Sequence, residues 1–151
     1  MKKINLGITG CLGRMGQQLI KSSKKDINFK LVTLTENVFI NKKVNGIKLE
    51  LNSEKAFKKT DIIIDFTVPS CTLEILKIAK RLKKKVVIGT TGFNKNQEDL
   101  IKKYSKKIPI LKAFSEFNSS LIPLTFLLIN TFSVSVTNLK LIFFLDDFIS
   151  C

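Results

Sequence analysis

The sequence predicts an α/β protein built on a doubly wound parallel sheet. Short apolar runs alternate with segments in which apolar residues recur at helical spacing. One run, residues 61–65, is apolar between two terminal acids, which is typical of a central parallel strand buried on both faces. A glycine-rich turn joins the first apolar run to the first helical segment. Alternation at this spacing predicts right-handed crossovers between parallel strands.

Residues 1–51 contain three predicted strands and one helix. Residues 4–8 form the first strand, and a helical pattern begins at Met15 and ends in the polar run 21–26. The second strand, residues 29–35, is rich in side chains that favour strands. The segment that follows is predicted to be a loop, except for a short strand at 47–51.

Residues 52–113 add three strands and three helices. A serine can cap a helix N-terminus, which predicts a short helix at 54–57 after Ser53 and a longer one at 72–82 after Ser70. The longer helix carries an apolar stripe formed by Leu73, Leu76, Ile78, Ala79 and Leu82. A last helix is predicted at 97–105. The three strands are residues 61–65, 86–88 and 108–112.

The turn after the first strand carries three glycines at equal spacing, Gly10, Gly13 and Gly16. A strand, a glycine turn and a helix N-terminus direct backbone N–H groups to one spot, which suits a pyrophosphate. In that arrangement Gly10 permits the tight turn, Gly13 leaves room for a phosphate, and Gly16 lets the helix pack closely on the strand. The alternative is a plain strand-to-helix turn without a ligand.

Glu36 closes the second predicted strand, 26 positions after Gly10. A carboxylate at this place can accept hydrogen bonds from both hydroxyls of an adenosine ribose, and it would repel a 2′-phosphate. The alternative is a surface glutamate in a turn. Because the glycine turn precedes it, we favour ribose binding.

Two further loops follow predicted parallel strands at their C-terminal ends, where doubly wound sheets bind ligands. Residues 67–70 follow the buried run, and residues 89–93 follow the next strand. The second loop contains two glycines and two threonines. An ordinary glycine turn explains that loop equally well on local grounds.

The formal net charge of +14 comes almost entirely from lysine. These lysines occur in pairs and triplets over several segments, neither along one helix nor interleaved with aromatic residues. We therefore favour a solvated surface and expect no nucleic-acid partner. A basic nucleic-acid-binding domain stays a distant alternative, which steeply salt-dependent DNA binding would support.

The few cysteines and the absence of histidine limit which metal sites the sequence can form. The three cysteines form no C-x-x-C pair and the sequence has no histidine, so we expect no metal site. A sparse, odd set of cysteines fits a reducing cytosol, and we expect a cytoplasmic location. Residues 1–8 lack the long apolar segment of a signal peptide.

Three motifs, in this order, carry a family resemblance. They are G-C-L-G-R-M-G at residues 10–16, D-F-T-V-P at 65–69 and V-I-G-T-T-G-F at 87–93. Over roughly residues 3–113 the chain resembles 4-hydroxy-tetrahydrodipicolinate reductase, also called dihydrodipicolinate reductase. The resemblance implies a Rossmann-like domain that binds NADH or NADPH. In the family, the cofactor reduces a cyclic imine, 4-hydroxy-tetrahydrodipicolinate, to tetrahydrodipicolinate in the diaminopimelate route to lysine.

The resemblance also implies which residues contact the cofactor. The glycine turn, with its arginine and methionine, would hold the pyrophosphate, Glu36 the ribose, and the loop at 89–91 would lie beside the nicotinamide ribose. Some members carry an arginine for the 2′-phosphate where this chain has Asn37, so we favour NADH. The expected cofactor-binding residues are Gly10, Cys11, Leu12, Gly13, Arg14, Met15, Glu36, Phe66, Thr67, Gly89, Thr90 and Thr91.

The resemblance ends near residue 113. The family continues with A-x-N-x-S-x-G-v-N, of which this chain keeps only Asn118 and Ser120, displaced. We therefore expect a dinucleotide-binding domain at residues 1–113 and a divergent apolar tail at 114–151. The family's proton donor and substrate clamp are a His-His pair, a lysine and a P-S-G-T loop. They have no counterpart here, so no catalytic residue is assigned, and most of the substrate domain that builds the family's homotetramer interface is missing.

The apolar stretch at 121–145 has three interpretations. A membrane anchor needs about 20 apolar residues, but four residues interrupt the stretch: Pro123, Asn130, Asn138 and Lys140. A core helix followed by a strand is the second, because residues 134–145 have β character. We favour the third, a frame-shifted or degenerated end, which predicts an exposed apolar tail and poor solubility. We expect no membrane partner.

Two functions of different class follow from these observations. The first is that of the family, a reductase with a small-molecule substrate in its full-length form. The alternative is a catalytically inactive fragment that binds nicotinamide nucleotide and lacks the substrate domain. For the 151 residues alone we expect binding of nucleotide without significant turnover.

Overall fold

The computed structural model describes residues 3–112, so the predicted tail at 114–151 lies outside the described residues. The described strands are β1 (Ile4–Thr9), β2 (Phe29–Glu36), β3 (Lys43–Val44), β4 (Ile47–Leu51), β5 (Ile62–Asp65), β6 (Lys85–Ile88) and β7 (Ile110–Lys112). The described helices are α1 (Arg14–Lys25), α2 (Glu54–Phe57), α3 (Pro69–Leu82) and α4 (Lys95–Ser105).

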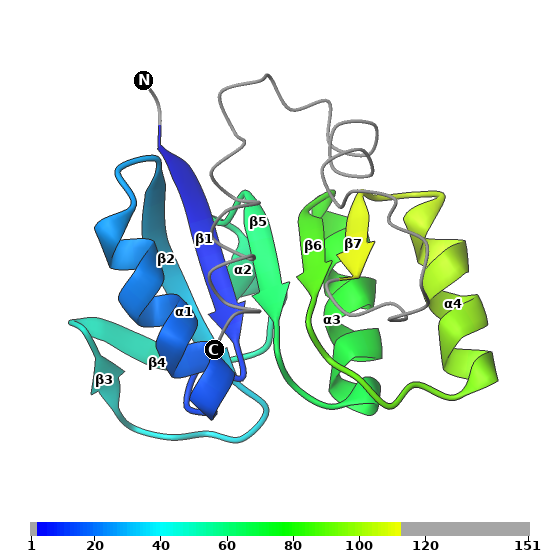
Figure 1. Cartoon of the computed structure of the whole chain (residues 1–151), viewed down its shortest axis with the longest axis horizontal. Coiled ribbons are helices and arrows are strands. Elements are labelled where there is room, and N and C mark those ends of the chain that lie inside the picture. Colours follow the sequence, from blue (N-terminus) through cyan, green and yellow to red (C-terminus); the bar gives the residue numbers. More distant parts are fainter. Residues whose placement is uncertain (1–2, 113–151) are drawn as a thin grey trace, which may run out of the picture.

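The strands form one sheet in the order β3-β4-β2-β1-β5-β6-β7 (Figure 1). Every neighbouring pair is parallel except β3 with β4. From β1 the chain moves outward to β2, and it later returns to the other side of β1 to form β5. This reversal marks the place where doubly wound sheets bind ligands. The predicted Rossmann-like α/β fold is confirmed.

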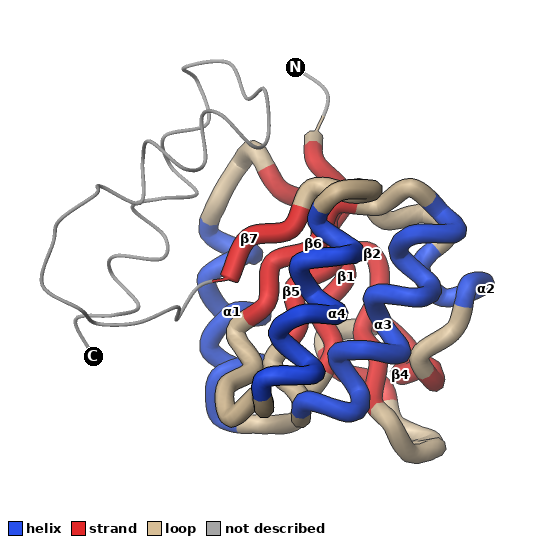
Figure 2. Tube along the Cα trace, turned by 90° about the vertical axis from the view of Figure 1, so that its right-hand side faces the viewer, coloured by secondary structure: helices blue, strands red, loops and turns tan. Residues whose placement is uncertain are grey.

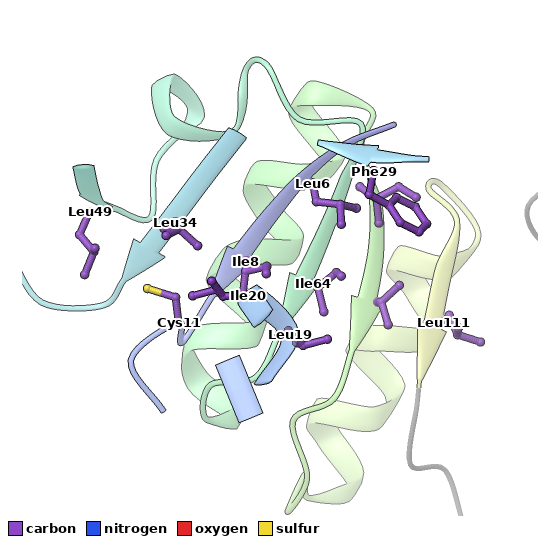
Figure 3. Close-up of a cluster of buried hydrophobic side chains, with 12 residues drawn as sticks. Leu6, Ile8, Cys11, Leu19, Ile20, Phe29, Leu34, Leu49, Ile64 and Leu111 are labelled. Carbon is purple, nitrogen blue, oxygen red and sulfur yellow. The ribbon is translucent and has the colours of Figure 1, made fainter. Parts of the chain in front are cut away.

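Helices cover both faces of the sheet, as the turned view in Figure 2 shows. On one face, Leu19 and Ile20 of α1 join a buried cluster with strand residues such as Ile64 (Figure 3). On the other face, α2, α3 and α4 contribute to a second buried cluster that contains Ile63. Because Ile63 and Ile64 are buried on opposite faces, β5 is the doubly covered central strand that its apolar run predicted.

The first helix, α1, ends at Lys25, within the polar run 21–26 as predicted, and it begins one residue before the predicted start at Met15. Lys24 and Lys25 occupy the last turn, where positive charge interacts favourably with the helix dipole. The Ser23 hydroxyl donates to the Ile20 carbonyl at 3.1 Å and is buried. The polar run therefore located the end of this helix, although most of the run is itself helical.

The segment predicted as a loop before residue 47 contains a strand, which is a correction. β3 pairs antiparallel with β4, and the two are joined by Asn45 and Gly46. Both joining residues have positive φ, 54° and 80°. Asn-Gly is the preferred dipeptide for such a two-residue hairpin turn, so the sequence carried a signal that was overlooked.

Of the three predicted helices that follow α1, two begin earlier than predicted and the start of one is confirmed. Ser53 caps α2, its side chain accepting from the Ala56 N–H. Ser70 does not cap α3, because the helix begins at Pro69, whose fixed φ suits the first helical position. α4 begins two residues earlier than predicted, because Asn94 caps it and forms a capping box with Gln97.

The apolar stripe predicted for α3 is only partly correct. Leu76 and Ala79 are buried, whereas the other three predicted members, Leu73, Ile78 and Leu82, pack partly buried against the same cluster. The fully buried Ile75 was not included. No helix within residues 3–112 is long and apolar enough to cross a membrane.

Candidate functional site

The glycine turn between β1 and α1 is fixed by the protein's own atoms at two of its three glycines. Gly10 has φ +71°, and a Cβ on it would overlap the carbonyl oxygen of Phe66. A Cβ on Gly16 would overlap the backbone of Gly10 and Cys11. The turn and the close packing of helix on strand therefore both require glycine, as predicted.

Gly13 differs from its two neighbours in the motif. It caps α1 with φ −65°, a conformation open to any residue, and a Cβ there would meet only the Gly10 carbonyl oxygen, at 3.3 Å. No side chain caps this helix end. The first helical bond runs from the Gln17 N–H to the Gly13 carbonyl at 3.0 Å, so the N–H groups of residues 14–16 precede the helical ladder.

Glu36 lies at the end of β2, directly beside the glycine turn. Its Oε1 accepts a hydrogen bond from the Leu12 N–H at 2.7 Å. The side chain is half-buried, and its negative charge sits near the positive end of α1. The structure therefore brings the predicted ribose-binding acid and the predicted pyrophosphate loop together.

Cys11 is a residue of the hydrophobic core and not an exposed, reactive thiol. Its side chain is fully buried in the cluster beneath α1 (Figure 3). Burial, reinforced by the charge of Glu36, raises the pKa of the Cys11 thiol to about 12. The thiolate is the reactive form of cysteine, so this residue is unsuited to nucleophilic chemistry at neutral pH.

Phe66 links the glycine turn to the loops that follow β5 and β6. Its N–H donates to the Thr9 carbonyl at 3.2 Å, and its own carbonyl faces Gly10. Its ring lies where a Cβ on Gly89 would be, so Gly89 must lack a side chain. Phe66, in the loop after β5, therefore contacts both the glycine turn after β1 and the loop after β6.

Thr67 and Thr90 meet across the same loops. The Thr67 N–H donates to Thr90 Oγ1 at 3.0 Å, and Thr67 Oγ1 donates to Asp65 Oδ1 at 2.6 Å.

Thr91 is exposed, and among the described residues no hydrogen bond joins its side chain to the other predicted contacts. Arg14 and Met15 form the first turn of α1, with Arg14 exposed.

Sequence reasoning missed Asn52 as a residue of this edge. Its side chain accepts from Thr9 Oγ1 at 3.0 Å and donates to Cys71 Sγ at 3.3 Å. Its N–H donates to the Glu36 carbonyl at 3.3 Å. A polar residue directly after a parallel strand was the available signal, because such positions face the ligand-binding edge.

These residues lie together at the C-terminal ends of β1, β2, β5 and β6, towards which the arrowheads of β1, β5 and β6 point in Figure 1. The sheet order and this arrangement at its C-terminal edge place the chain in the Rossmann-like class of α/β domains, and an open helix N-terminus beside a carboxylate is the arrangement that suits a dinucleotide in that class. Among residues 3–112, no group of three or more histidine, cysteine or acidic side chains is placed to hold a metal ion.

Comparison with known proteins narrows this class to a family of oxidoreductases. The family model described as "Dihydrodipicolinate reductase, N-terminus" matches residues 4–115. The chain therefore belongs to the dihydrodipicolinate reductase family and corresponds to its N-terminal part.

Curated relatives agree with this assignment. The 4-hydroxy-tetrahydrodipicolinate reductase of Pelagibacter ubique (strain HTCC1062) is 74% identical over 113 residues, which cover 75% of this chain and 44% of that protein. The reductase of the same name from Buchnera aphidicola (subsp. Acyrthosiphon pisum, strain Tuc7) is 42% identical over 126 residues, 74% of this chain and 46% of that protein. The chain thus spans less than half the length of these relatives.

A solved structure with the same fold is the dipicolinate-bound dihydrodipicolinate reductase from Paenisporosarcina sp. TG-14. It superposes with a TM-score of 0.63 at 23% identity, over 74% of this chain and 47% of that one. The myo-inositol 2-dehydrogenase from Lactobacillus plantarum superposes with a TM-score of 0.61 at 20% identity, over 74% and 36%. At these identities the likeness supports the fold alone.

Proposed function

We propose that this chain binds a nicotinamide dinucleotide, NADH or NADPH, at the C-terminal edge of its parallel strands. The observation that carries the proposal is the N-terminus of α1 at Gly13, which no side chain caps, with the Glu36 carboxylate held 2.7 Å from the Leu12 nitrogen. A pyrophosphate fits the first group and an adenosine ribose fits the second.

The space at Gly13 supports the fit of a pyrophosphate. A Cβ on Gly13 would make a single close contact, 3.3 Å from the Gly10 carbonyl oxygen, so packing explains this glycine less fully than it explains Gly10 and Gly16. An approaching phosphate would supply the further reason for glycine at this position. The exposed Arg14 would add positive charge beside the phosphates. The loops that contain Thr67 and Thr90 would flank the nicotinamide ribose. When bound, the reduced nicotinamide supplies a hydride.

For the whole protein, we propose the reaction that gives the curated relatives their name. The chain would contribute the nucleotide site for reduction of 4-hydroxy-tetrahydrodipicolinate, a small-molecule substrate, in the diaminopimelate route of lysine biosynthesis. The substrate domain and homotetramer interface of the family are expected outside residues 1–113. The free cysteines Cys11 and Cys71 support a location in the reducing cytoplasm.

The alternative is that the 151 residues bind nucleotide but do not turn over substrate. They contain no histidine, whereas protonation of an imine nitrogen during hydride delivery needs a positioned acid. We expect no substrate-dependent oxidation of NADH or NADPH by this chain, followed at 340 nm. Measurable turnover would refute this alternative.

Glu36 should set the choice between the two nucleotides. In Glu36→Ala the ribose loses its acceptor, so we expect the Kd for NADH to rise about tenfold, equivalent to one charge-assisted hydrogen bond. Affinity for NADPH should fall less or improve, because the charge that repels a 2′-phosphate is gone. Fluorescence titration of both nucleotides measures the two constants.

Glu36→Gln is the matched control for this experiment. It keeps the size of the side chain and one carbonyl acceptor for the Leu12 N–H, but it removes the charge. Its ratio of NADPH to NADH affinity should move in the same direction as that of Glu36→Ala, with a smaller loss of NADH binding. An unchanged ratio in both variants would remove Glu36 from nucleotide selection.

A further inference from the structure

Asp65 is a buried acid that the proposed nucleotide contacts do not use. It ends β5, and its side chain is completely buried. Within residues 3–112 it takes part in no ion pair. Burial raises the pKa of its carboxyl group. A buried carboxylate without a counter-ion is costly, so its partners must account for its presence.

Three threonine hydroxyls supply those partners, and each comes from a different segment. Thr67 follows β5 and donates to Oδ1 at 2.6 Å. Thr72 lies near the start of α3 and donates to Oδ2. Thr90 follows β6 and donates to Oδ2 at 3.2 Å. The Asp65 carboxylate therefore binds the loop after β5, the loop after β6 and the first turn of α3.

The direction of the hydrogen bonds between the threonine hydroxyls and Asp65 determines how the two loops are joined. An ionised carboxylate only accepts, so it turns all three hydroxyl protons inward. Thr90 Oγ1 then presents a lone pair to the Thr67 N–H, which donates to it at 3.0 Å. The result is a closed ring of Asp65, Thr67 and Thr90 that joins the loop after β5 to the loop after β6.

We propose that Asp65 is a positioning residue for the nicotinamide half of the nucleotide site, acting by locking these two loops together before the nucleotide arrives. The inference rests on the proposed function, because the loops it joins are those expected beside the nicotinamide ribose. Asp65 itself touches no substrate or cofactor in this account.

The test compares four variants of the full chain by NADH titration and by NMR exchange of the Thr67 amide without nucleotide. Asp65→Asn can donate to a hydroxyl and so reverse its orientation, and Thr90→Val removes the acceptor of the Thr67 N–H. We expect both variants to lose protection of this amide and to bind NADH about tenfold more weakly.

Two controls separate positioning from stability. Thr72→Val removes a hydroxyl from the same carboxylate but leaves the Thr67–Thr90 link, so NADH affinity should stay within about twofold even if the melting temperature falls. Thr90→Ser keeps the hydroxyl and should restore both readouts. If Asp65→Asn does not fold, exchange of the Thr67 amide in the Thr90 pair carries the test, because Thr90 is itself an expected cofactor contact and its NADH affinity alone would not separate positioning from direct binding.

Retained protection of the Thr67 amide in either loop-breaking variant would overturn the proposal, and so would an equal loss of affinity in Thr72→Val. If the unmodified chain does not bind NADH, the proposed function itself fails. If it binds NADH and Asp65→Asn binds equally well, only the positioning role fails.

Discussion

Gly10→Ala is expected to destabilise the fold by about 3 kcal/mol or more, because two costs add. Alanine is strained at φ +71°, and its Cβ would overlap the Phe66 carbonyl oxygen on the neighbouring strand end. That backbone position is itself held by the bond from the Phe66 N–H to the Thr9 carbonyl, so it cannot easily move. Thermal unfolding should show a melting temperature lower by about 10 °C.

Gly46→Ala is the matched control. Gly46 has a similar φ of +80°, but no atom lies within 4 Å of the position that a Cβ would take. Only the conformational cost remains, about 1 kcal/mol, and the melting temperature should fall by only a few degrees. Equal losses in the two variants would show that the contact with Phe66 does not constrain the turn.

Gly13→Val is expected to abolish nucleotide binding with little effect on folding. The backbone conformation at Gly13 suits valine, and replacing glycine at a helix cap costs about 1 kcal/mol. The added methyl groups would occupy the space in front of the helix N-terminus where a pyrophosphate must approach. We expect the Kd for NADH to rise about 100-fold or more, because several phosphate contacts are lost together.

A graded series makes this result specific. Gly13→Ala should weaken binding less than Gly13→Val, since its Cβ meets only the Gly10 carbonyl oxygen, at 3.3 Å. Gly46→Ala, in the hairpin between β3 and β4, should bind NADH like the unmodified chain. Normal NADH affinity in Gly13→Val would exclude the glycine turn as the pyrophosphate site.

Much of the fold was predictable because it follows from short sequence patterns, such as apolar runs and glycine spacing. The apolar run ending at Asp65 identified the central strand, and the glycine spacing identified the first strand-to-helix turn. The hairpin at Asn45 and Gly46 and the start of α3 at Pro69 were also visible in the sequence and were missed.

The rest of the site could not be predicted, because it depends on contacts between segments far apart in the chain. Thr67, Thr72 and Thr90 converge on Asp65 only after three segments have folded against one another. The sequence did offer a signal for Asn52 at this edge, but its partners Thr9 and Cys71 are likewise brought to it only by the folded sheet. No spacing rule fixes which polar side chains meet at the end of a parallel strand.

Hydrogen–deuterium exchange of the full chain, with and without saturating NADH, tests the central claim most directly. A nucleotide bound at the proposed site should add protection in residues 10–16, around Glu36, and in the loops at 66–68 and 89–91. The β3–β4 hairpin should be unchanged. No change at the glycine turn, or protection confined to other segments, would contradict a nucleotide site at this edge of the sheet.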